Sequence, residues 1–210
     1  MILARASAVT TTPSPPKKME GFSLYENAIH RVTIQYPTTW SKQEILLSND
    51  HNDHTGLHVM FVVPIGMRFS NSEDLETTNN KIRYAIYNQF FPEVVLSLKT
   101  LLVPETFTLR DITNDHIHAL RICFENVNIV ETLYGYNLRK IPSSKLLYTY
   151  TDPLQNHLHK KGMKIIGINE HTEISITYSS QNEDFDRFFP TVGRMVDTLS
   201  IWDSLDFYSD

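Results

Sequence analysis

The stretch FSLYENAIHRVTIQYPTTW, residues 22–40, carries most of the structural information near the start of the chain. It contains two short runs, FSLYEN and RVTIQYP, in which apolar and polar residues alternate, and residues 28–30 separate them. Alternation with period two places every second side chain on one face of a strand, here Val32, Ile34 and Tyr36. We therefore expect a β-hairpin whose second strand faces a core.

More strands and a helix are expected up to residue 102. KQEILLS, residues 42–48, predicts a third strand, and the nearly continuous apolar run LHVMFVVPI, residues 57–65, predicts a central strand covered on both faces by helices. Residues 72–90 predict one such helix, with Ser72 as N-cap and an apolar stripe of Leu75, Ile82, Ile86 and Phe90. Pro92 breaks it, and the spacing of apolar residues in EVVLSLKTLL, residues 93–102, predicts a second short helix or turn.

The second half of the chain repeats the strand pattern. Residues 105–115 and 116–126 are expected to be paired strands joined by a turn at Asn114 and Asp115, with one face made by Leu120, Ile122 and Phe124. Residues 126–144 predict an irregular excursion, residues 145–151 a strand, and residues 152–162 a turn-rich connection.

A hairpin and a helix are expected to close the chain. MKIIGIN and EISITYSS flank a turn at Glu170 and His171. Residues 182–202 then predict a helix in which Phe188 belongs to the core, on a stripe formed by Phe185, Phe188, Val192, Met195, Val196 and Leu199.

This order of elements predicts an α+β fold, a central antiparallel sheet flanked by helices on two faces. With 210 residues and 41% hydrophobic composition, one domain is expected over residues 21–202. Residues 203–210 form a short acidic tail, and residues 1–20 a Thr/Pro-rich tail or spacer that is too poor in apolar residues to pack.

Composition also bounds function. The net charge of -5 and the lack of a basic cluster argue against a nucleic-acid partner. No segment approaches the roughly 20 apolar residues that span a bilayer, so a membrane-spanning chain is not expected. The single cysteine, Cys123, allows no intrachain disulfide and is expected to be a buried apolar residue in a strand.

The tail bears on localisation. Ala6, Ser7 and Ala8 match the small-x-small pattern that precedes a signal-peptidase cut, but the apolar stretch that should precede it is missing. Either the true start lies upstream, which favours a secreted or membrane-tethered protein, or the match is a coincidence and the protein is cytoplasmic.

Histidines are the most obvious candidate metal ligands. In HNDHTGLH, residues 51–58, His51, Asp53, His54 and His58 offer ligands for zinc or copper. The spacing matches no helical metal motif, so we expect a solvated loop and predict that His54→Ala abolishes no tight site. The pairs His116 with His118 and His157 with His159 would each share a face of an extended strand, but neither is expected to hold a physiological metal.

Enzyme motifs are not found. The chain has no Gly-x-Ser-x-Gly, no phosphate-binding glycine loop and no His-Glu-x-x-His. Glu183, Asp184 and Asp186 are expected to complement a helix dipole rather than form a catalytic dyad. No catalytic residue, cofactor or metal is therefore predicted, and the chain is not expected to be an enzyme.

Two segments, YENAIHRVTIQYPTTW (25–40) and ISITYSSQNEDFDRFFPTVGRMVDTLSIW (174–202), resemble the PsbP-like family. In that family a Tyr-x-Asn turn, a strand ending in Tyr-Pro-x-x-Trp and a closing strand and helix recur. Here Pro37 would end a strand and Trp40 would cover the sheet edge. The resemblance implies an α/β/α sandwich.

The resemblance says less about function. The family's namesake is an extrinsic subunit on the lumenal face of photosystem II, and a structural relative binds the small GTPase Ran, so neither is an enzyme of known reaction. The photosystem-binding N-terminal segment is not matched here, and fold does not imply function. Archaeal and bacterial chains of this type include secreted and lipid-anchored proteins.

Two functions follow as expectations. The first is a non-catalytic binding or assembly module outside the cytoplasm, which docks on a protein partner or membrane complex through one face of its sheet. The second is a small-ligand or metal-carrying protein that uses a cleft near the histidine-rich loop 51–58. A hydrolase with an unrecognised site is a weaker third.

Overall fold

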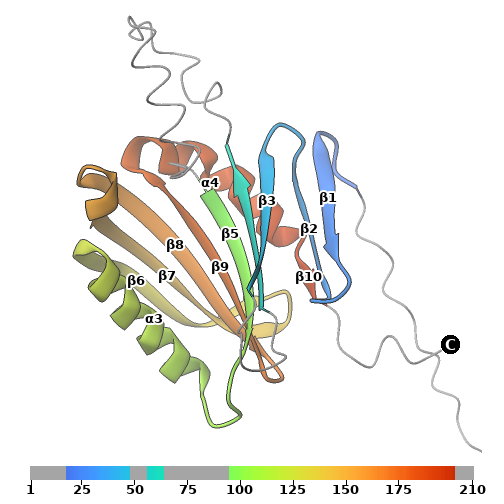
Figure 1. Cartoon of the computed structure of the whole chain (residues 1–210), viewed down its shortest axis with the longest axis horizontal. Coiled ribbons are helices and arrows are strands. Elements are labelled where there is room, and N and C mark those ends of the chain that lie inside the picture. The colour runs from blue at the N-terminus through green and yellow to red at the C-terminus, as the bar shows by residue number, and fades with distance from the viewer. Residues whose placement is uncertain (1–17, 48–55, 64–94, 202–210) are drawn as a thin grey trace, which may run out of the picture.

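The computed structural model describes residues 18–47, 56–63 and 95–201. Ten strands, two α-helices and one short 3-10 helix lie in the described residues, and Figure 1 shows their arrangement. The strands are β1 (Phe22–Asn27), β2 (Val32–Pro37), β3 (Ser41–Leu47), β4 (Gly56–Val62), β5 (Val95–Leu102), β6 (Glu125–Leu138), β7 (Ile141–Asp152), β8 (Leu158–Asn169), β9 (Thr172–Gln181) and β10 (Ser200–Ile201). The helices are α3 (Leu109–Cys123), α4 (Asn182–Asp197) and the short 3-10 helix η1 (Pro153–Gln155).

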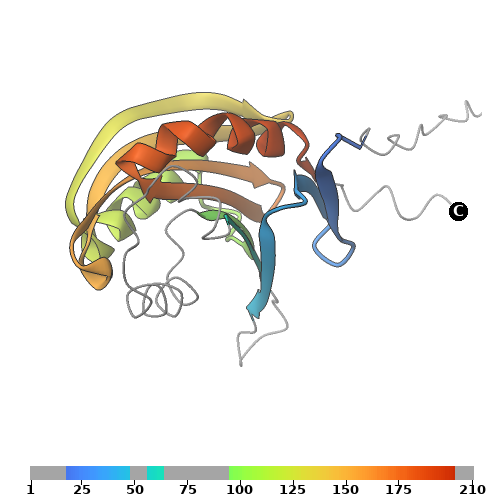
Figure 2. The ribbon, with the colours of Figure 1, turned by 90° about the horizontal axis from the view of Figure 1, so that it is seen from above.

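The strands form two antiparallel sheets. A seven-stranded sheet has the order β3-β4-β5-β9-β8-β7-β6, and a three-stranded sheet has the order β1-β2-β10. The described helices lie on opposite faces of the large sheet, α4 above it and α3 below it in Figure 1. Seen from above in Figure 2, α4 lies in front of the strands and α3 behind them. The fold is therefore the α/β/α arrangement that the sequence predicts.

The opening hairpin is confirmed. β1 and β2 pair from Phe22 opposite Pro37 to Asn27 opposite Val32. Val32 and Ile34 are fully buried, as period-two alternation requires of a strand that faces a core. Trp40 is also buried, and its ring lies edge-on to that of Phe188 on α4, with centroids 6.1 Å apart.

The main core lies between α4, the small sheet and one face of the large sheet. Alternate residues of the central strands point into it, and the apolar stripe of α4 meets them. Phe188 is only partly buried, whereas Phe185 is 2% exposed and stacks on Phe189 with ring centroids 5.4 Å apart. A second, smaller core joins α3 to the opposite face of the large sheet and contains Ile112, Leu120, Leu146, Tyr148, Tyr150 and Ile166.

Strand β4 only partly matches its prediction. It pairs with β3 on one side and β5 on the other, so it is an interior strand, but it is second from the edge rather than central. Leu57, Val59 and Phe61 are fully buried in the main core, whereas His58 and Met60 on the other face are half-buried. One face of β4 is thus less covered than predicted.

The helix or turn expected at residues 93–102 is wrong, because Val95–Leu102 form strand β5. Leu96 and Leu98 are fully buried and Thr100 is nearly so, while Ser97 and Lys99 between them are half-buried. The helical spacing of apolar residues in this segment is therefore a coincidence, and the segment is a strand whose two faces are both at least partly covered.

The pair of strands expected at residues 105–126 is also wrong, because Leu109–Cys123 form helix α3. A capping box begins it: the Thr108 hydroxyl accepts a hydrogen bond from the Asp111 backbone N–H, and the Asp111 carboxylate accepts one from the Thr108 backbone N–H. Ile122, expected on a sheet face with Leu120 and Phe124, is 70% exposed. The expected buried Cys123 is exposed at the end of the helix.

The irregular excursion expected at residues 126–144 is instead regular. It forms most of the edge strand β6 and the start of β7, with register shifts where the ladder is interrupted. In the expected turn-rich connection, β8 already begins at Leu158. Gly162, the last residue of that expected connection, lies in β8 against the Tyr148 ring, where any side chain would clash.

Several expectations fall outside the described residues. They are the helix over residues 72–90, the loop at 48–55, the tail at 1–17 and the acidic end at 203–210. The hairpin of β8 and β9 is confirmed, with Glu170 in the left-handed region at φ 51°.

Candidate functional site

Two lysines and three hydroxyl residues lie together on the large-sheet face that carries α3. We call this set the lysine face: Ser97, Lys99, Lys164, Ser175 and Thr177. Lys99 on β5 lies opposite Ser175 on β9, and Ser97 lies opposite Thr177. Thr177 in turn lies opposite Lys164 on β8, so the five residues occupy two adjacent cross-strand rows.

The strand alternation explains why these polar residues share a face. Their neighbours Leu98, Ile176 and Ile165 point into the main core and are almost completely buried. The polar residues between them must therefore point to the other face. Helix α3 packs mainly over β6, β7 and β8, and Lys99, Ser97 and Thr177 remain partly exposed.

Lys164 is the most perturbed charge of the lysine face. The pKa of its ammonium is lowered to about 8, chiefly because of burial; the Glu173 charge opposes this shift and the Lys99 charge contributes to it. Within the described part of the chain, neither Lys99 nor Lys164 forms an ion pair. Lys164 therefore holds a positive charge in a poorly solvated place without a contacting counter-ion among the described residues.

Glu173 flanks the lysine face but is engaged by α3. Its carboxylate accepts a hydrogen bond from His116 Nε2 at 2.7 Å, and it is 7% exposed. Burial alone would raise the pKa of Glu173, but hydrogen bonds from His116 and Ser175 and the nearby charges of His116 and Lys164 lower it overall. The carboxylate is held by His116 and Ser175, and no ion pair among the described residues joins it to Lys99 or Lys164.

His58 lies beside the lysine face, opposite Lys99. Burial, and after it the Lys99 charge, lower the pKa of its imidazole to about 4. His58 is therefore neutral at neutral pH. Of the candidate ligands in HNDHTGLH, His51, Asp53 and His54 fall outside the described residues.

The two histidine pairs are not brought together. His116 and His118 lie two residues apart on a helix and point to different sides, because successive helical residues rotate by about 100°. His157 lies in a turn 3.1 Å from Glu125, while His159 lies 3.1 Å from the Thr151 hydroxyl. Among the residues described, no group of three His, Cys, Asp or Glu side chains is placed to hold a metal.

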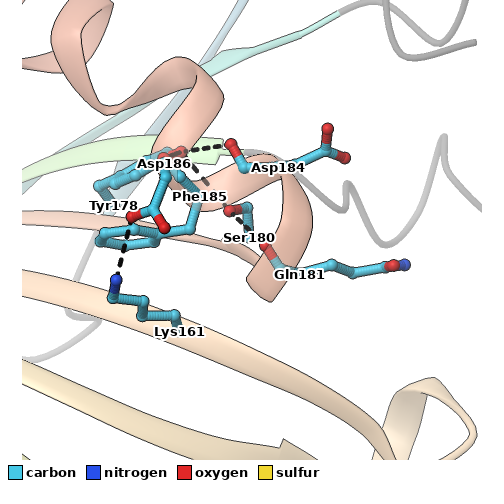
Figure 3. Close-up of polar contacts among 7 residues, drawn as sticks. All are labelled: Lys161, Tyr178, Ser180, Gln181, Asp184, Phe185 and Asp186. Atoms are coloured by element: carbon cyan, nitrogen blue, oxygen red, sulfur yellow. Dashed lines mark hydrogen bonds and ion pairs between the residues drawn. The ribbon is translucent and has the colours of Figure 1, made fainter. Parts of the chain in front are cut away.

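The acidic residues at the start of α4 have separate structural contacts, as Figure 3 shows. Lys161 Nζ donates to Asp186 at 3.0 Å, whereas the Asp184 side chain points away from Asp186. Beside them the Tyr178 hydroxyl donates to the Phe185 carbonyl at 2.9 Å. These contacts fix the first turn of α4 on β8 and β9, and they do not bring two carboxylates together. Glu183, the third acid of this group, is exposed.

Sequence reasoning missed Lys99 because residues 93–102 were predicted to be a helix or turn, and it missed Lys164 and Glu173, which lie in correctly predicted strands, because their neighbours depend on strand order. A period-two pattern in VLSLKTLL would have placed Ser97 and Lys99 on one strand face. Only the strand order brings that face next to Lys164, and strand order cannot be read from local patterns.

Neither described helix is long and apolar enough to cross a membrane. No family model matches the chain, and no curated protein matches it in sequence. Among solved structures, it is similar to cyanobacterial PsbP (CyanoP) from Synechocystis sp. PCC 6803, with a TM-score of 0.54 and 10% identity over 91% of this chain and 98% of that chain. LpqN of Mycobacterium tuberculosis, described as involved in cell envelope biogenesis, has a TM-score of 0.43 and 6% identity over 82% of this chain and 83% of that chain. The likeness to CyanoP shows that the fold is PsbP-like.

Proposed function

We propose that this protein is a non-catalytic binding or assembly module that acts outside the cytoplasm and docks on a protein or membrane-complex partner through the lysine face. The observation that carries the proposal is Lys164, a charged side chain held in a poorly solvated place without an ion pair to a described residue. Burial disfavours the protonated form of Lys164, so the charged side chain lowers the stability of the fold. A charge that costs stability is typical of a functional position.

The grouping of charged and hydroxyl side chains supports binding more than hydrolysis. Ser175, Glu173 and His116 are linked, but the carboxylate lies between the hydroxyl and the imidazole. In a hydrolytic triad the imidazole must contact the hydroxyl in order to remove its proton. Ser175 is buried and contacts the carboxylate instead of the imidazole, so these three residues do not form the serine–histidine pair of a hydrolytic triad.

A location outside the cytoplasm rests on the resemblance and on the tail pattern. The fold class is shared with an extrinsic photosystem subunit, and residues 1–18 have the composition of a spacer. This part of the proposal is tested separately, by fractionating cells that express the full gene and locating the protein by immunoblot. Protein found only in the cytosolic fraction would refute it.

Docking is tested by capture from the native membrane fraction with three baits. The wild-type chain is compared with Lys164→Gln and with Lys161→Gln, a control that removes one charge from the same strand on the opposite face. We expect a protein that wild type and Lys161→Gln retain and that Lys164→Gln loses. Equal retention by all three baits, or retention by none, would exclude docking through this face.

A further inference from the structure

We infer that the lysine face receives a carboxylate-bearing, extended segment of the partner, whose acidic side chains contact Lys99 and Lys164. The inference rests on the proposed docking function and names the chemistry that the face would recognise.

The first support is charge complementarity. Lys99 and Lys164 point to the same face and form no ion pair with any residue that the structure describes. The one described acid beside them, Glu173, is held by His116 at 2.7 Å and by Ser175. His58 is neutral and adds no charge of either sign at neutral pH. An anionic group would therefore relieve the mutual repulsion of the two lysines.

The second support is the arrangement of hydroxyl groups between the lysines. Ser97 and Thr177 lie in the row of Lys164 and are partly exposed, whereas Ser175 in the row of Lys99 is buried and hydrogen-bonded to Glu173. Hydroxyls donate hydrogen bonds to carboxylate oxygens, and a site partly shielded from water strengthens such bonds. Lys99 and Lys164 are one two-residue step apart along the strands, about 7 Å, and two strands apart across the sheet, about 10 Å, so an extended segment spans the roughly 12 Å between them in about four residues.

The third support is the partial burial of the lysines, which disfavours a bilayer as the occupant. Lys99 and Lys164 are each only partly exposed, and α3 packs over the neighbouring strands on the same face. A planar lipid surface attracts lysines that protrude into water, whereas a narrow peptide reaches lysines recessed beside a helix.

The test uses a fluorescent, acetylated hexaglutamate peptide, with hexaglutamine as the uncharged control, and measures binding to the full chain by anisotropy. We expect hexaglutamate alone to bind, with an affinity that falls as salt is raised. Lys99→Gln and Lys164→Gln should each weaken binding about tenfold, as expected for loss of one partly desolvated charge contact. Lys161→Gln should bind like wild type, and Lys164→Arg should retain most of the affinity.

Stability measurements separate loss of contact from loss of fold. Lys164→Gln is expected to bind more weakly although it unfolds at a higher denaturant concentration than wild type. Absence of hexaglutamate binding, or binding that both lysine variants leave unchanged, would overturn the inference. So would binding of inorganic phosphate alone or of phosphatidylglycerol vesicles alone. If membrane capture still depends on Lys164 while hexaglutamate fails to bind, the inference of an acidic partner segment is refuted, but the proposal of docking through the lysine face is not.

Discussion

Replacing Lys164 by methionine should make the protein more stable at neutral pH. The side chain is buried enough that its pKa falls from 10.5 to about 8. One pKa unit corresponds to about 1.4 kcal/mol, so the protonated lysine lowers the free energy of unfolding by up to about 3 kcal/mol. Because the side chain keeps some contact with water, we expect methionine to restore about 1 to 3 kcal/mol.

The gain should depend on pH in a defined direction. Below pH 8 the lysine is protonated in both the folded and the unfolded chain, and its cost is fully present. Between pH 8 and 10.5 the unfolded chain binds more protons than the folded chain, so the stability contributed at this site rises with pH. The advantage of Lys164→Met should therefore shrink over this window and vanish above it.

Urea unfolding of both proteins at about pH 7 and about pH 10 measures the effect. All other titrating groups are common to both proteins, so the difference between them isolates position 164. Lys161→Met is the matched control, because Lys161 lies on the same strand and makes a partly exposed ion pair with Asp186. Its loss should change the free energy of unfolding by less than about 1 kcal/mol.

Two outcomes would refute the reasoning. If Lys164→Met were less stable than wild type at neutral pH, the ammonium would be making favourable contacts that outweigh its burial. If the gain stayed constant from neutral to alkaline pH, it would come from apolar packing of methionine and not from removal of a charge.

Four further changes test the fold and its tail by chemical or thermal unfolding. Thr108→Ala removes the capping box of α3 and should cost about 1 kcal/mol, whereas an unchanged stability would mean that the helix end is held by other contacts. Phe185→Ala should cost about 3 to 5 kcal/mol because the ring is almost completely buried, and a loss below about 1 kcal/mol would place it outside the core. His116→Ala leaves the Glu173 carboxylate short of a donor and should cost about 1 to 3 kcal/mol at neutral pH. Because the pKa of Glu173 is lowered, its contribution is present above pH 4.5 and lost on acidification, and the variant should lose less stability over that acid range than wild type. Deletion of residues 1–18 should leave the melting temperature within about 2 °C, and a larger fall would make the tail part of the fold.

The sequence predicts strands well where apolar and polar residues alternate, even where the polar face is buried too, as at Thr33 and Gln35 of β2. β1, β2 and the hairpin of β8 and β9 all have clean alternation, and each lies where it was expected. The pattern fails for β5, because apolar residues at its ends mimic helical spacing while its polar residues are themselves half-buried. The order of apolar and polar residues along a strand, and not its burial, therefore decides whether period-two reasoning succeeds.

Helix α3 was missed for a related reason. Its apolar residues are few, and Ile122 faces solvent, so alternate residues at its end look like a strand face. The capping residues Thr108 and Asp111 were the available signal, since a threonine followed three residues later by an acid marks a helix start. Use of that signal would have predicted the helix and placed Cys123 at its C-terminal end, where the structure shows it exposed.

The lysine face shows why part of a site stays hidden from the sequence. Lys99 and Lys164 lie 65 positions apart, and each on its own is an ordinary lysine in a strand. They share one face of the sheet because β9 pairs with β5 on one side and with β8 on the other. Their proximity also raises the cost of each charge, since the charge of Lys99 lowers the pKa of Lys164. Neutralising Lys164 should therefore raise the free energy of unfolding and weaken binding. A residue that serves only the fold would not show this combination, because its replacement would not weaken binding while stabilising the protein.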